Sequence, residues 1–108
     1  MRGKKKIRRF TPIEFVNFMK AGKDLRDYFP YGSSERDRAE KSMALLEQYQ
    51  AGGLVEFPEY SSALKGAVTL KNMFRTADPE YRKADTLLSA LMRAYAASTR
   101  QLGASASY

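Results

Sequence analysis

Residues 78–103, DPEYRKADTLLSALMRAYAASTRQLG, hold the longest regular hydrophobic pattern in the chain. Intervals of three and four residues, which keep side chains on one face of an α-helix, separate Tyr81, Ala84, Leu88, Leu91, Tyr95, Ser98 and Leu102, with Leu87 and Ala94 beside them. The pattern predicts a helix over residues 79–102. Asp78 and Pro79 are typical of a helix start, and Gly103 is expected to end it.

The clearest helix start in the chain lies near the N-terminus. Thr11 has the position of an N-cap, Pro12 that of the first helical residue, and Glu14 completes a capping box with Thr11. This helix is expected to run to about Ala21, where Gly22 is free to adopt the left-handed conformation that often ends helices.

Two more helices are expected between these. Ser34 is the predicted cap of a helix over residues 35–50, which Gly52 ends. A third helix is predicted over residues 58–76. The stretch 54–57 is interpreted as a packed connector, since no partner strand is evident. The predicted apolar faces consist of Ala39, Met43, Leu46 and Tyr49, and of Tyr60, Ala63, Ala67, Leu70 and Phe74.

These elements predict an all-α fold, a small helical bundle of about four helices. The length of 108 residues suits one domain. Residues 10–102 form the expected helical domain. Residues 1–9 are interpreted as a mobile basic arm, and residues 103–108 as a flexible C-terminal tail.

The composition argues against catalysis. The chain has no cysteine and no histidine, so it lacks thiolates, zinc–sulfur sites and imidazole bases. No glycine-rich phosphate loop and no calcium-binding loop is present. We therefore expect a protein that is not an enzyme and that holds no cofactor and no metal.

The cellular setting follows from hydropathy alone. No apolar run reaches the roughly 18 residues that a membrane span needs. We expect a cytoplasmic protein without a membrane partner, associated with a nucleoid or a particle, or with the nucleus if the source is a eukaryote.

The basic arm is the first candidate binding site. The chain holds 19 Lys and Arg against 12 Asp and Glu, a net charge of +7. Residues 10–59 carry a charge of −3 and residues 60–108 a charge of +4. The arm carries six cations and no acid: Arg2, Lys4, Lys5, Lys6, Arg8 and Arg9. Such a segment can neutralise phosphates, with a salt slope near −5 on duplex DNA if all six engage. The alternative is a solubilising tail or, in a eukaryote, an import signal.

The second candidate lies on the last helix. Arg82, Arg93 and Arg100 are 11 and 7 residues apart, which places them within about 20° of one another on a helix. No acid of that helix lies on this line. The arginines are expected to face outward, opposite the apolar face, and to bind phosphate; the alternative is an ordinary solvated surface.

The third candidate is the aromatic loop around Pro30. Tyr28, Phe29 and Tyr31 are suited to stacking on unpaired bases or to binding a protein partner. The alternative is a loop that closes one end of the core.

These observations favour a non-catalytic nucleic-acid-binding accessory protein, with DNA and RNA both open. The arm and the arginine face would contact the phosphate backbone. The alternative is a structural or assembly subunit of a larger complex or of a phage or viral particle. In that case the arm would bind an acidic protein surface or packaged nucleic acid. Self-association stays open, because oppositely charged halves of neighbouring molecules attract each other.

Overall fold

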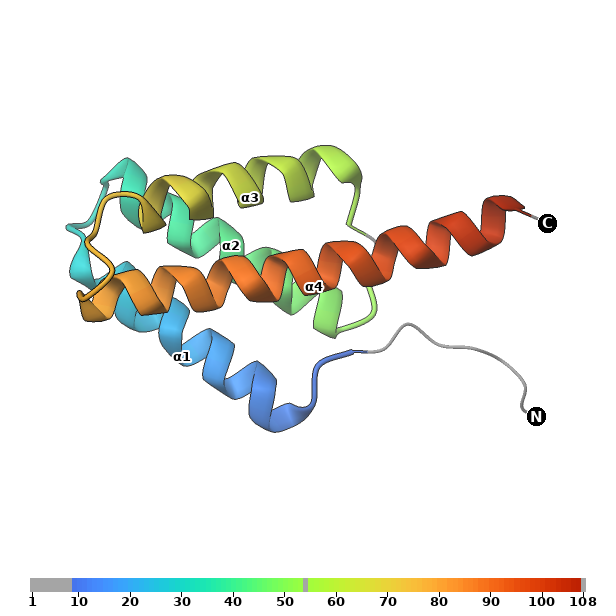
Figure 1. Cartoon of the computed structure of the whole chain (residues 1–108), viewed down its shortest axis with the longest axis horizontal. Coiled ribbons are helices and arrows are strands. Elements are labelled where there is room, and N and C mark those ends of the chain that lie inside the picture. The colour runs from blue at the N-terminus through green and yellow to red at the C-terminus, as the bar shows by residue number, and fades with distance from the viewer. Residues whose placement is uncertain (1–8, 54, 108) are drawn as a thin grey trace.

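The computed structural model describes residues 9–53 and 55–107, with side chains through residue 98. Four helices make up this part: α1 (Pro12–Tyr28), α2 (Ser34–Gln50), α3 (Phe57–Lys71) and α4 (Pro79–Ser107). The described ranges contain no strand, so the predicted all-α bundle of about four helices is confirmed. Consecutive helices run antiparallel, and α4 contacts the other three (Figure 1). Apart from Arg9, the predicted arm lies outside the described residues.

Helix α1 begins as predicted and ends later. The Thr11 hydroxyl accepts the Glu14 N–H at 3.1 Å, and the Glu14 carboxylate accepts the Thr11 N–H at 3.0 Å. The predicted end at Ala21 is wrong, because the helix continues to Tyr28 with Gly22 in its interior.

Close packing explains the glycine at position 22. A Cβ atom built there would lie 2.6 Å from Cγ of Met43 and 3.3 Å from Cδ2 of Leu87. Gly22 therefore lets α1 approach α2 and α4, and it does not end the helix. Since a glycine serves both purposes, sequence alone could not distinguish them.

Helix α2 is close to its prediction. Its N-cap is Ser33, whose hydroxyl accepts the Arg36 N–H at 3.1 Å, so the predicted cap at Ser34 is wrong by one residue. Gly52 has a φ of 94°, a conformation that ends the helix and suits glycine. The four predicted apolar residues of this helix are all buried.

Helix α3 ends at Lys71, so the prediction of a helix through residue 76 is wrong. The chain turns instead, and the Asp78 carboxylate accepts the Arg75 N–H at 2.9 Å, which shapes the turn before α4. Phe74 thus lies in the connector, half-buried against the core. The interpretation of the stretch after Gly53 as a connector holds for the described residues 55 and 56; Phe57 begins α3.

Helix α4 begins at Pro79 as predicted but continues to Ser107, so the expected end at Gly103 is wrong. A glycine inside a helix costs only about 1 kcal/mol, and the alanines around it favour helix. Residues 103–107 are therefore helical. The residues of α4 that are fully buried are Ala84, Leu87, Ala90, Leu91 and Ala94, whereas Leu88 and Tyr95 lie half-buried at the edge.

Candidate nucleic-acid interface

The root of the basic arm is attached firmly to the bundle. Phe10 is 5% exposed and packs against the rings of Phe18 and Tyr49, with centroids 4.9 and 5.3 Å away. The side-chain amide of Gln50 accepts the Phe10 N–H at 3.1 Å and donates to the Phe10 carbonyl at 2.9 Å. Phe10 is therefore held at a defined point, the C-terminal end of α2.

Arg9 belongs to this root. Its guanidinium lies 4.6 Å from the centroid of the Tyr49 ring, and one of its nitrogens, Nη1, is buried without a hydrogen-bond partner among the described atoms. The structure thus places Arg9 on the body, and the prediction that the mobile arm includes residue 9 is wrong. The five cations that precede it lie outside the described residues.

The amide of Gln50 should contribute measurably to folding. We expect Gln50→Ala to lower the free energy of unfolding by about 1–2 kcal/mol, because both backbone groups of Phe10 lose a partly buried partner. Urea unfolding followed by circular dichroism measures the change. Gln50→Glu is the matched variant, since it keeps the acceptor and loses the donor; a loss equal to that of alanine would contradict the role of the acceptor.

The arginines of the predicted face on α4 differ in their surroundings. Arg93 donates to both carboxylate oxygens of Glu14 at 3.3 and 3.4 Å, from a helix 79 residues away in sequence. Its guanidinium also lies 5.0 Å from the centroid of Phe10. The acid that pairs with Arg93 thus comes from α1, while the sequence of α4 itself places no acid on this line. Arg82 is exposed and makes no ion pair within the described part, while the side chain of Arg100 lies outside it.

The capping carboxylate of Glu14 is tuned by these contacts. Its pKa lies below the ordinary value, first because it accepts the Thr11 N–H and then because Arg93 donates to it. Because the pKa is lower in the folded state than in the unfolded state, the charged carboxylate stabilises the folded protein at pH values above the unfolded-state pKa. This stabilisation is lost as the pH falls through the folded-state pKa.

We expect the Glu14 carboxylate to make the thermal stability of the protein depend on pH. Wild type should melt at a higher temperature than Glu14→Gln at pH 7, and the difference should vanish as pH falls well below about 4.5. Glutamine retains the acceptor for the Thr11 N–H, so the variant isolates the charge. Thermal unfolding of both proteins across this range measures the difference. A difference that does not change with pH would show that the charge has no part in it.

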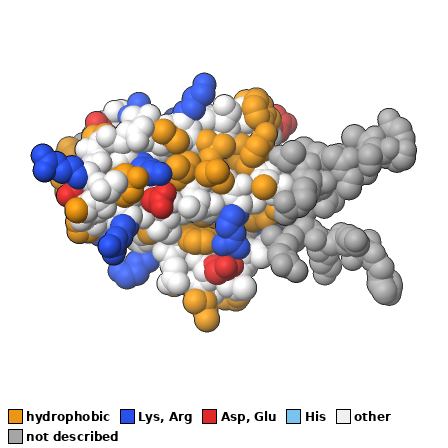
Figure 2. All heavy atoms as spheres, viewed as in Figure 1, with side chains coloured by type: hydrophobic (Ala, Val, Ile, Leu, Met, Phe, Trp, Pro, Cys, Tyr) orange, Lys and Arg blue, Asp and Glu red, His pale blue; other side chains and the backbone are white. Residues whose placement is uncertain are grey.

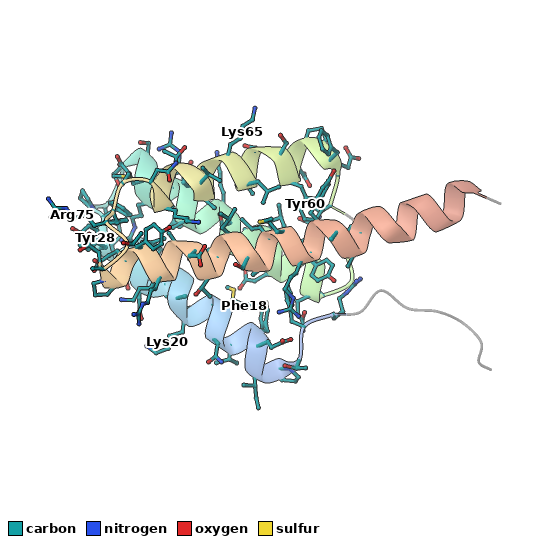
Figure 3. The ribbon with its side chains drawn as sticks, viewed as in Figure 1. Phe18, Lys20, Tyr28, Tyr60, Lys65 and Arg75 are labelled. Carbon is teal, nitrogen blue, oxygen red and sulfur yellow. The ribbon has the colours of Figure 1, made fainter. Side chains whose placement is uncertain are left out.

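The aromatic loop around Pro30 both closes one end of the core and exposes aromatic rings to solvent. Phe29 is 7% exposed and closes one end of the core, as the structural alternative predicted. Tyr28 and Tyr31 are 57% and 87% exposed. Tyr28 lies beside the rings of Phe29 and Phe74, and Figure 3 shows it at the same end of the molecule as Arg75. Two tyrosine rings are therefore available to a partner at this end.

A buried arginine that local sequence pattern does not single out supports the loop. Arg36 is 8% exposed and donates to the carbonyls of Arg26 and Phe29, each at 3.3 Å. Its guanidinium lies 3.9 Å from the centroid of the Tyr31 ring. Asp27 and Glu40 lie 3.6 and 3.8 Å from it. The only local signal was its i,i+4 spacing to Glu40, which is common on exposed helices.

The candidate residues do not gather into one site. Arg93 contacts Phe10, whereas Arg82 lies in the first turn of α4, about 16 Å earlier along the helix. The start of α4 and the loop between α1 and α2, which holds Phe29 and Tyr31, lie at the end of the bundle opposite to the projecting part of α4 (Figure 1). Residues 9–98 contain thirteen Lys and Arg and twelve Asp and Glu. Most of the ion pairs join side chains that are close together on the surface of the body. The described body is thus nearly neutral.

Within residues 9–53 and 55–107, no group of carboxylates, histidines or cysteines is arranged to hold a metal ion. None of the helices described is long and apolar enough to cross a membrane.

Comparison with known proteins finds no matching protein family, and no similar curated protein or solved structure.

Proposed function

We propose that the chain is a non-catalytic nucleic-acid-binding accessory protein that contacts phosphates through its N-terminal residues. The observation that carries this proposal is the distribution of charge. The described body holds thirteen cations and twelve acids, whereas residues 1–8 hold five cations and no acid. The charge that can release counterions from a polyanion is therefore concentrated before Arg9.

The attachment of the arm supports the same proposal. Phe10 is held by Gln50 and by two aromatic rings, so the part of the chain that directly follows these cations is fixed on the body, beside Arg93. A solubilising tail does not require such a root. Arg82 and the exposed ring of Tyr31 lie at the far end of the body, where they add a weaker second contact.

The test is a set of binding isotherms with fluorescent single- and double-stranded DNA and RNA at 50 and 200 mM salt. We expect micromolar or tighter binding at the lower salt, with little dependence on base sequence, because phosphate contacts carry no sequence information. Absence of binding to all four oligonucleotides at low salt would refute the proposal.

The second candidate is an assembly subunit whose arm binds an acidic protein surface. The exposed apolar side chains of Phe57, Val68 and Met92 favour it, since such side chains are typical of protein contacts. Polyglutamate of matched charge is the discriminating ligand. Binding to polyglutamate that equals or exceeds binding to oligonucleotides supports this second function.

A further inference from the structure

The loop between α1 and α2 presents Tyr31 at the tip of a tight turn. The Ser33 N–H donates to the Pro30 carbonyl at 3.2 Å, which makes Tyr31 the second of the four turn residues. Gly32, the third, has a φ of 82°, as a type II turn requires, and glycine adopts this conformation without strain. Tyr31 is 87% exposed at this position. The turn thus fixes the backbone that carries the exposed ring.

A buried cation lies on one face of the Tyr31 ring. The guanidinium of Arg36 is 3.9 Å from the ring centroid, and it is itself held by the carbonyls of Arg26 and Phe29. No second ring or cation of the described residues lies on Tyr31, so the other face of its ring is open to solvent. A ring that is already fixed loses little conformational entropy when a flat group stacks on its free face.

Tyr28, the last residue of α1, is fixed by two neighbouring rings. It packs edge-to-face with Phe29 and Phe74, with centroids 5.2 and 5.4 Å away and interplanar angles of 86° and 77°. Phe29 belongs to the core, and Phe74 packs against the core. Tyr28 itself is 57% exposed. We call Tyr28 and Tyr31 the loop tyrosines, since both are held by more buried neighbours and both offer ring surface to solvent.

The surface around the loop tyrosines carries no excess of positive charge. Residues 29–35 and 72–82, which meet at this end of the bundle, hold two arginines and three acids, a net charge of −1. These are Arg75, Arg82, Glu35, Asp78 and Glu80. Figure 2 shows basic and acidic side chains intermixed at this end, and Figure 3 places Tyr28 and Arg75 there. Phosphates alone are therefore not attracted to this end, and the loop tyrosines are what it offers to a ligand.

We propose that the loop tyrosines stack on unpaired bases, so that the protein binds single-stranded nucleic acid more tightly than duplex. This inference rests on the proposed function, in which the N-terminal residues supply the attraction to phosphates. Unpaired bases present flat faces, which aromatic side chains bind with little dependence on base identity. In a duplex the bases are stacked on one another, and the same faces are out of reach.

One strand is able to contact both ends of the body. Phe10 lies just before the start of α1 and Tyr28 at its end, and α1 is about 24 Å long at 1.5 Å per residue. A strand of about seven nucleotides covers this distance even at the duplex rise of 3.4 Å per nucleotide. Once the N-terminal residues hold such a strand, stacking on the loop tyrosines becomes an intramolecular step, and weak contacts then add to the affinity.

A protein partner fits the loop tyrosines less well. A tyrosine anchors a protein interface when the contacts around it exclude water. Tyr31 is followed by Gly32, Ser33 and Ser34, which offer no apolar side chain for such contacts. A base needs only one free ring face, and Tyr31 has one.

Binding isotherms of the full chain at low salt test the preference. The ligands are a DNA strand longer than about seven nucleotides, an abasic strand of equal length, and a duplex with the same total number of phosphates. Charge alone favours the duplex, which condenses more counterions per phosphate. We expect the base-containing strand to bind at least about fivefold more tightly than the abasic strand, and more tightly than the duplex.

The outcomes separate this inference from the proposed function. Equal binding of the base-containing and abasic strands would overturn stacking and leave the phosphate contacts in place, with the loop tyrosines free for a protein partner. Tighter binding of the duplex would also overturn it. Absence of binding to all three ligands would refute both proposals. The chain has no tryptophan, so quenching of its tyrosine fluorescence by the base-containing strand gives a second readout.

Substitutions locate the contact. Tyr31→Ala should weaken binding of the base-containing strand at least about fivefold and leave the abasic strand unchanged, and adding Tyr28→Ala should weaken it further. Tyr31→Phe keeps the ring and should keep the affinity. The matched control is Phe57→Ala, which removes an aromatic ring that is 63% exposed on α3. No loss in Tyr31→Ala, or an equal loss in Phe57→Ala, would overturn the proposal; thermal unfolding confirms that each variant is folded.

Discussion

We expect that replacing the five cations of residues 2–8 with alanine removes most of the salt dependence of the proposed nucleic-acid binding. These are Arg2, Lys4, Lys5, Lys6 and Arg8. Each phosphate contact contributes about −0.9 to the slope of log K against log salt on duplex DNA, so the slope should fall from between −4 and −5 to about zero. For wild type, raising salt from 50 to 200 mM should weaken binding several-hundred-fold, and the variant should bind weakly at both concentrations.

Arg9 is kept in this variant, because its guanidinium packs on Tyr49 and its loss would affect folding as well as binding. The control removes five cations from the body: Lys20, Lys23, Arg38, Lys41 and Lys65. Both variants lower the net charge equally, so long-range attraction falls equally in both. Equal loss of the salt slope in the two proteins would show that net charge matters and that the arm has no special role.

Gly22→Leu should have the largest effect on stability. Even a Cβ atom at this position would lie 2.6 and 2.7 Å from Cγ and Sδ of Met43, inside the contact distance. A leucine must separate α1 from α2 and α4 in the middle of the core, which should cost about 3 kcal/mol or more after the gain in helix propensity. Urea unfolding measures the loss against a total stability of about 5–15 kcal/mol.

A double-mutant cycle tests whether the clash with Met43 causes the loss of stability in Gly22→Leu. Met43→Ala removes the side chain that the leucine strikes, so the double variant Gly22→Leu with Met43→Ala should lose less than the two single losses combined. Gly66→Ala is the matched control, since the nearest atom to a Cβ there is a side-chain carbon of Arg38 at an ordinary 3.4 Å. It should be neutral or stabilise the protein by up to about 1 kcal/mol. Strict additivity in the cycle would contradict the packing explanation.

The candidate site could be predicted only in part from the sequence. Local sequence pattern predicts that Tyr28, Tyr31 and Arg82 are at the surface, and all three are exposed. The partner of Arg93 could not be found in this way, because the Glu14 carboxylate lies 79 residues away and already had a local role in the capping box. The contact of Arg9 with Tyr49 and the amide contact of Gln50 with Phe10 likewise join residues 40 apart.

The sequence by itself determined the number of helices, the start of α1 at Pro12 and the buried side of α2. Hydrophobic periodicity and capping depend on residues within one or two helical turns, so they can be read locally. The tertiary structure alone decided that Gly22 lies inside a helix and that α4 passes Gly103 to project beyond the bundle. A glycine is compatible with a helix end, a close helix crossing or a tolerated interior position, and only the neighbours that pack against it select one of these.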